Sequence, residues 1–138
     1  METSNWREKM ARSDRKRLLV VDDDAAMGEF VARVAEELGY LVECFTDGDS
    51  FLAALDRSDP DIILLDLTMP GTDGFQLIGA LSDKGTRARI YVMSGFDPGH
   101  QRMALQLGEA KGLAMRGLIP KPVRAAALRD LLSQDGAE

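Results

Sequence analysis

Short apolar runs alternate along the chain with segments in which apolar residues recur every three or four positions. Continuous runs of four to six residues are typical of strands buried on both faces, whereas the spaced pattern is typical of amphipathic helices. The runs predict five strands, at residues 18–21, 40–45, 62–65, 89–93 and 118–119. The spaced segments predict five helices, within residues 27–38, 51–55, 75–81, 98–115 and 123–132.

This alternation predicts a single α/β domain with a doubly wound parallel sheet, helices on both faces and right-handed crossovers. We assign residues 17–133 to the folded domain, residues 1–16 to a flexible N-terminal arm and residues 134–138 to a C-terminal tail. Within the arm, Trp6 and Met10 are spaced for one helical face and are candidates for docking on the domain.

Composition narrows the class of protein. A chain of 138 residues with 45% hydrophobic and 29% charged residues has the balance of a globular domain. A net charge of −6 argues against a nucleic-acid-binding surface, and no apolar run approaches the ~20 residues that span a membrane. The single cysteine, Cys44, excludes a disulfide framework and fits the reducing cytoplasm, and its strand-like setting predicts a buried thiol.

Polar residues follow four of the five predicted strands. Residues 22–24, all aspartates, follow the first strand, Asp66 the third, Ser94 the fourth, and Lys121 lies beside the end of the fifth. The carboxyl ends of parallel strands meet at one edge of the sheet, so these side chains are expected to be neighbours. Crowded carboxylates raise one another's pKa unless a cation intervenes, and hard oxygen ligands favour Mg²⁺.

A hydroxyl and an ammonium group opposite such a metal are suited to hold the remaining oxygens of a phosphoryl group. Ser94 and Lys121 provide these two groups. The predicted chemistry is therefore transfer of a phosphoryl group onto a carboxylate, which gives an acyl phosphate on Asp66.

About residues 17 to 133 resemble the receiver domain of two-component response regulators. The resemblance is carried by four motifs, each after its strand: Val21-Asp22-Asp23-Asp24, Leu65-Asp66-Leu67-Thr68-Met69-Pro70-Gly71-Thr72-Asp73-Gly74, Met93-Ser94-Gly95 and Pro120-Lys121-Pro122. It implies a flavodoxin-like (CheY-like) fold with strand order 2-1-3-4-5. It also implies phosphorylation by a phosphohistidine of a histidine kinase or phosphotransfer protein, and signalling through a downstream protein partner as a monomer or phosphorylation-dependent dimer.

The resemblance assigns a role to each matching position. It makes Asp66 the phosphoacceptor and a direct Mg²⁺ ligand together with Asp23, while Asp22 acts on the metal through water and Thr68 supplies a backbone carbonyl. Ser94 and Lys121 would each bind a phosphoryl oxygen, and the family commonly has a cis peptide at Lys121–Pro122. The chain would then catalyse only its own phosphorylation and dephosphorylation.

Other polar and apolar residues near these motifs have structural interpretations. Asp24 is expected to cap the first helix, and Asp73–Gly74 to shape a turn and begin the third. Pro70 and Gly71 are expected to fix the loop after Asp66. His100, the only histidine, is expected on the surface, and a set of apolar residues is expected in core and shielding contacts, namely Met103, Leu105, Leu107 and Leu113.

The chain departs from the family in two places. Leu118 stands where the family usually has a Tyr or Phe that swings inward on phosphorylation, so the usual aromatic switch is in doubt. The segment between Ser94 and Lys121 is longer than usual, which predicts a lengthened or shifted fourth helix and an altered loop into the fifth strand.

Phe96 near the phosphate, with Thr68 as the other variable residue, predicts slow self-dephosphorylation.

Three alternative functions remain open. A pseudo-receiver that never cycles phosphate is favoured by Leu118. A receiver belonging to a longer cyclic-dinucleotide phosphodiesterase regulator is favoured by the long segment after Ser94, which resembles such receivers. A Mg²⁺-dependent aspartyl-phosphate phosphatase would need a second acid two residues after the nucleophile, where this chain has Thr68, and a cap domain.

Overall fold

The computed structural model of the chain describes residues 15–69, 72–95 and 98–136. Within these residues five strands form the main sheet: β1 (Arg17–Val21), β2 (Leu41–Phe45), β3 (Ile62–Asp66), β6 (Arg89–Ser94) and β7 (Ala114–Pro120). They alternate with five helices: α2 (Ala25–Glu37), α3 (Gly48–Leu55), α4 (Gly74–Lys84), α5 (Pro98–Ala110) and α6 (Ala125–Gly136). Between β3 and α4, the short strands β4 (Thr68–Met69) and β5 (Thr72–Asp73) pair antiparallel.

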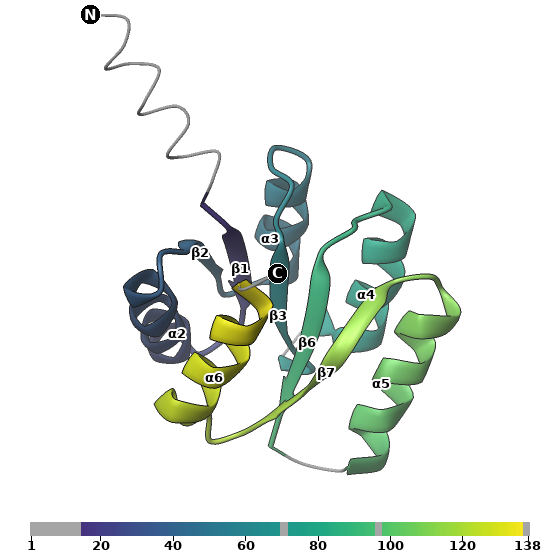
Figure 1. Cartoon of the computed structure of the whole chain (residues 1–138). Helices are drawn as coiled ribbons and strands as arrows, with labels where there is room; N and C mark the ends of the chain where they lie inside the picture. Colours follow the sequence, from purple (N-terminus) through teal and green to yellow (C-terminus); the bar gives the residue numbers. More distant parts are fainter. Residues whose placement is uncertain (1–14, 70–71, 96–97, 137–138) are drawn as a thin grey trace, which may run out of the picture.

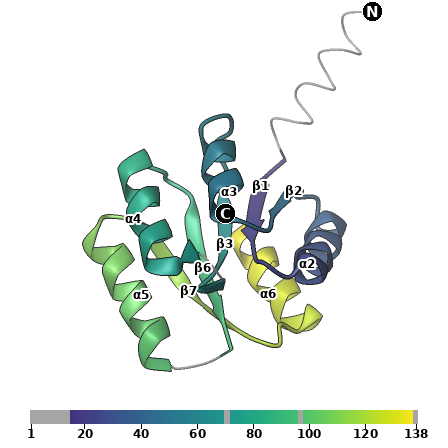
Figure 2. The same ribbon diagram turned by 180° about the vertical axis from the view of Figure 1, so that it is seen from behind.

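The main sheet is parallel throughout and has the order β2-β1-β3-β6-β7. This is the predicted order 2-1-3-4-5, because the labels β4 and β5 belong to the small hairpin outside the main sheet. Helices α2 and α6 cover one face and α3, α4 and α5 cover the other (Figures 1 and 2). The flavodoxin-like fold is therefore confirmed.

The core consists of two apolar layers, one on each face of the sheet. Phe51, Ile78 and Ala104 belong to the layer beneath α3, α4 and α5, and Val31 and Leu128 to the layer beneath α2 and α6. Strand β3 is buried along its whole length because it lies in the middle of the sheet. Its side chains point alternately into the two apolar layers, which explains why its sequence is continuously apolar, as expected for a central parallel strand.

The first helix begins and ends as predicted. The Asp24 carboxylate accepts a hydrogen bond from the Ala26 N–H, 3.0 Å away, and so caps α2. After the helix Gly39 adopts φ of +93°, a left-handed conformation that costs glycine little and ends the helix. Gly74 likewise begins α4, as expected for the Asp73–Gly74 turn.

The expected long helix after Ser94 is wrong at its C-terminal end. Helix α5 ends at Ala110, and Gly112 follows with φ of +86°, which stops the helix although the apolar spacing continues. The residues from Ala114 onwards belong to β7, which begins at Ala114 and not at Leu118. The register against β6 shifts within this extension, and Arg116 is the extra residue.

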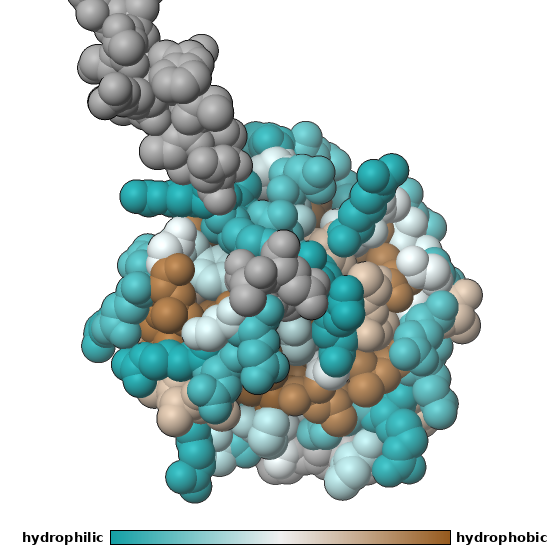
Figure 3. All heavy atoms as spheres, viewed as in Figure 1, coloured by the Kyte–Doolittle hydropathy of each residue, from teal (hydrophilic) through white to brown (hydrophobic). Residues whose placement is uncertain are grey.

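Two burial predictions are also wrong. Cys44 is exposed because β2 is an edge strand, which has a neighbouring strand on one side only. The Met103 side chain on α5 is 58% exposed, whereas Leu105 and Leu107 are half-buried and Leu113 is buried, as expected for core contacts. Seen from the side of Figure 1, the surface is mostly polar, with a band of apolar side chains across the lower middle of the view (Figure 3).

Several predictions concern positions outside the described residues. These are the docking of Trp6 and Met10, the turn at Pro70–Gly71 and the position of Phe96. Among the described residues, no helix combines the length and the apolar character needed to cross a membrane.

Candidate functional site

The loops that follow the strands stay side by side because main-chain hydrogen bonds continue past the strand ends. The Asp22 N–H donates to the Phe45 carbonyl at 2.9 Å, and the Leu67 N–H donates to the Met93 carbonyl at 3.1 Å. The Lys121 N–H donates to the Ser94 carbonyl at 3.2 Å. The sheet thus fixes the backbone directly beneath the predicted site.

Asp22 and Asp66 are held in the same way. One oxygen of each carboxylate accepts the N–H of the residue two positions later: Asp22 Oδ1 from Asp24 at 2.9 Å, and Asp66 Oδ1 from Thr68 at 3.1 Å. The other oxygen of each lies near the Lys121 ammonium, with Nζ 2.9 Å from Asp22 Oδ2 and 3.3 Å from Asp66 Oδ2. Lys121 therefore bridges the ends of β1 and β3.

The burial of these groups changes their acidity. Asp22 is 2% and Asp66 1% exposed. Burial raises the pKa of the Asp66 carboxyl to about 6, and the Asp22 charge acts in the same direction, whereas the Thr68 N–H and Lys121 oppose the change. Burial disfavours the charged form of Lys121, yet its ion pair with Asp22 and the charge of Asp66 raise its pKa above the ordinary value.

Asp23 completes an acidic cluster with these two carboxylates. Single carboxylate oxygens of Asp22, Asp23 and Asp66 all lie within 4.8 Å of one another. Asp23 is exposed, so the cluster opens towards solvent on its side. Three carboxylates at this spacing fit a hard divalent cation that keeps part of its water shell, as Mg²⁺ does.

The other predicted site residues lie at the same edge. Ser94 ends β6 and is 3% exposed, and Thr68 is the first residue of β4, two residues after Asp66 at the end of β3. The Lys121–Pro122 peptide bond is cis, as expected. The structure thus brings the carboxylates, the hydroxyl residue and the lysine to one edge of the sheet.

One further residue at this edge was not predicted. Gln101, on α5, donates from Nε2 to the Ser94 carbonyl at 3.2 Å. A helix glutamine bonded to a main-chain carbonyl leaves no pattern in the sequence, so nothing singled it out. His100 beside it is exposed as expected, and its ring packs edge-on against Phe75 of α4 with the ring centroids 4.8 Å apart.

The comparison with known families agrees with this geometry. The response regulator receiver domain matches residues 18–133. The chain belongs to this family. This receiver domain is 35% identical over 119 residues to the response regulator MprA of Mycobacterium leprae, covering 86% of this chain and 48% of that protein. It is 33% identical over 120 residues to the positive alginate biosynthesis regulatory protein of Pseudomonas aeruginosa, covering 85% and 46%.

The receiver domain thus spans about half the length of the curated relatives it matches. Among solved structures, a response regulator from Colwellia psychrerythraea is 30% identical with a TM-score of 0.78, covering 88% of this chain and 97% of that one. The chemotaxis response regulator CheY4 of Vibrio cholerae is 25% identical with a TM-score of 0.73, covering 88% and 98%. These structures support the same fold along nearly the whole receiver domain.

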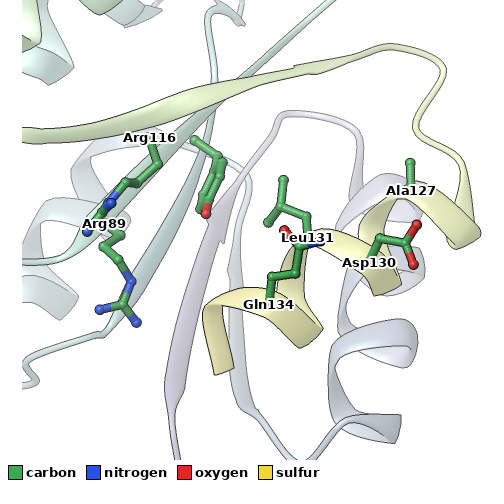
Figure 4. A pocket seen from close by; sticks show the side chains of 7 residues that line it. Arg89, Arg116, Ala127, Asp130, Leu131 and Gln134 are labelled. Atoms are coloured by element: carbon green, nitrogen blue, oxygen red, sulfur yellow. The ribbon is translucent and has the colours of Figure 1, made fainter. Parts of the chain in front are cut away.

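A pocket of about 540 Å³ lies away from this site, between α6 and the strands β6 and β7. Figure 4 shows Arg89 and Arg116 on its strand side and Asp130 on α6. Arg116 reaches this face of β7 beside Gly117, where the register of the strand shifts. None of the predicted site residues lines the pocket, which is formed by Arg89, Tyr91, Arg116, Ala127, Asp130, Leu131 and Gln134.

Proposed function

We propose that this receiver domain accepts a phosphoryl group on Asp66, with Mg²⁺, from a phosphohistidine of a histidine kinase or phosphotransfer protein. It then signals by docking to a downstream protein. The observation that carries the proposal is the Lys121 ammonium placed between Asp22 and Asp66, 2.9 and 3.3 Å from their oxygens, beside an acidic cluster. A phosphoacceptor carboxylate needs this combination of a metal site and a fixed cation.

The donor set supports Mg²⁺ at this site. In this proposal Asp23 and Asp66 bind the ion directly, Asp22 acts through water, and the Thr68 carbonyl adds a further oxygen. When bound, the ion would offset the negative charge of the carboxylates and of the incoming phosphoryl group. It would also favour the ionised form of Asp66, whose pKa is raised to about 6 by burial.

The transfer step breaks the N–P bond of the phosphohistidine and forms a bond between phosphorus and an Asp66 carboxylate oxygen. The imidazole leaves with the electron pair of the broken bond. Lys121 moves from its ion pair with Asp66 to a phosphoryl oxygen while it keeps Asp22, and the Ser94 hydroxyl binds a second phosphoryl oxygen. The protein's own catalysis is limited to forming and hydrolysing this acyl phosphate.

A pseudo-receiver is the second candidate, because Leu118 has no ring and is 39% exposed. The phosphatase alternative has less support, since Thr68 stands two residues after Asp66 in place of the acid.

The test is incubation with Mg²⁺ and acetyl phosphate, followed by intact-mass measurement. Wild type should gain one phosphate, and Asp66→Asn should gain none. Asp59→Asn, which removes an exposed carboxylate outside the acidic cluster, is the matched control and should behave as wild type. If wild type gains no phosphate and beryllofluoride changes no spectrum, the pseudo-receiver is correct, and turnover of an external phosphoester would favour the phosphatase.

A further inference from the structure

The Ser94 carbonyl joins three parts of the site. It accepts a hydrogen bond from the Lys121 N–H and another from Gln101 Nε2, both at 3.2 Å. Ser94 ends β6, Lys121 follows β7, and Gln101 lies in the first turns of α5. A displacement of the Ser94 main chain must therefore alter its bond to the lysine or its bond to the helix.

Of these two hydrogen bonds, the one between the Lys121 N–H and the Ser94 carbonyl is the more rigid. A Cβ added to Gly95 would lie 3.4 Å from the Lys121 Cβ, an ordinary van der Waals distance, so the two loops run close to each other. The Lys121 ammonium is in turn held by Asp22, a contact that it keeps in the proposed transfer step. Movement of Ser94 is thus more easily taken up by the side chain of Gln101, which is half-buried.

The other end of α5 is packed closely against β7. Gly108 lies so near Met115 that an added Cβ would be 2.6 Å from the Met115 Cγ. Gln101 links the first turn of α5 to the site at the opposite end of the helix, so a change at Gln101 acts first on that turn.

We infer that Gln101 is a positioning residue that couples phosphorylation of Asp66 to helix α5 through the Ser94 carbonyl. This inference rests on the proposed function, in which the Ser94 hydroxyl binds a phosphoryl oxygen. Formation of that bond moves Ser94, the Ser94–Gln101 hydrogen bond changes, and the first turns of α5 are loosened or tightened in response.

Amide hydrogen exchange of α5, measured with and without Mg²⁺ and beryllofluoride, tests this coupling. Gln101→Met keeps the length of the side chain and removes the donor. Without beryllofluoride the α5 peptides of this variant should exchange about fivefold faster than those of wild type, the effect of losing one net hydrogen bond. Beryllofluoride should change the exchange of the α5 peptides in wild type but not in this variant. The variant should still gain one phosphate from acetyl phosphate.

Two further variants separate a coupling role from a general effect on the helix. Gln106→Met makes the same substitution at an exposed position of α5 and should keep the wild-type response. Gln101→Lys retains a donor at position 101 and should restore a response to beryllofluoride.

A full wild-type response in Gln101→Met, or loss of phosphate uptake by that variant while wild type is phosphorylated, would overturn the inference. Failure of wild type itself to gain phosphate would instead overturn the proposed function.

Discussion

The carboxyl edge of the sheet consists of buried charges fixed in place by main-chain hydrogen bonds, whereas α5 and β7 meet through close apolar contact. At the edge, buried Asp22 and Asp66 share one ammonium group, and main-chain bonds fix the loops around them. On the other side, the absence of a side chain at Gly108 leaves room for the flexible Met115 side chain, and the register of β7 shifts nearby. The first region tolerates little change in geometry, and the second can adjust by moving a side chain.

This difference fits the proposed roles of the two regions. A phosphoryl-transfer site needs groups already in place, because reorganisation during the reaction would raise its barrier. A region that reports phosphorylation needs a second arrangement of similar free energy. Substitutions that add one methyl group to each region, or remove one charge, therefore test the comparison directly.

The largest effect is expected from Gly74→Ala, at the start of α4. The added Cβ would lie 2.8 Å from Leu67 Cδ2 and 3.0 Å from both the Leu67 Cα and its carbonyl oxygen. Leu67 cannot withdraw easily, because its N–H is bonded to Met93 across the sheet. Overpacking against backbone should lower the free energy of unfolding by about 3 kcal/mol, measured by urea denaturation.

Gly79→Ala is the matched control on the same helix. A Cβ at this position meets nothing within 4 Å, so helix propensity alone should raise the free energy of unfolding, by about 0.5–1 kcal/mol. A Gly74→Ala variant as stable as wild type would mean that the Leu67 backbone can move and that the edge is not rigid.

The second prediction removes a charge from the same edge. Burial raises the pKa of Asp66 from 3.8 to about 6, so the folded protein binds this proton more tightly than the unfolded chain. The contribution of Asp66 to stability therefore falls as pH rises from about 4 to about 6, and the loss is complete above that range. Without Mg²⁺, Asp66→Asn should be more stable than wild type at pH 7.5, by about 1–3 kcal/mol.

Urea denaturation in a chelating buffer at pH 7.5 and pH 4 measures this difference. The gain should nearly vanish at pH 4, and Asp59→Asn, an exposed carboxylate, should show no comparable pH-dependent gain. An Asp66→Asn variant that is less stable than wild type at pH 7.5 would contradict the raised pKa.

The sequence predicts the carboxyl edge better than the α5–β7 side for a physical reason. Asp66 and Lys121 follow apolar runs, and parallel topology alone brings the ends of those runs together. The end of α5 depends on whether Gly112 or the apolar spacing of Leu113 and Met115 prevails, and Gly112 prevails. The hydrogen bond from Gln101 arises only once the chain has folded.

Cys44 is a second position at which the sequence pattern alone gives the wrong prediction. An apolar strand pattern predicts burial, but burial also depends on the place of the strand in the sheet, and β2 lies at an edge. In the structure the Sγ atom lies 3.3 Å from the Gly28 carbonyl, yet the residue remains exposed. The sulfur itself is partly covered by this contact, and its partial desolvation, together with the charges of Glu36 and Glu29, raises the pKa of the thiol.

The smallest effect is expected on the α5–β7 side, from Gly108→Ala. The added Cβ would overlap the Met115 sulfur and lie 2.6 Å from its Cγ, but this side chain is flexible and half-buried. The cost of moving Met115 should roughly cancel the gain in helix propensity, so the net change is within about 1 kcal/mol. In a Met115→Ala background the clash is absent, and Gly108→Ala should raise the free energy of unfolding by about 1 kcal/mol. A double-mutant cycle from urea denaturation measures this coupling. If the two substitutions act independently, the Met115 side chain does not pack against Gly108, and α5 and β7 are not in close contact there.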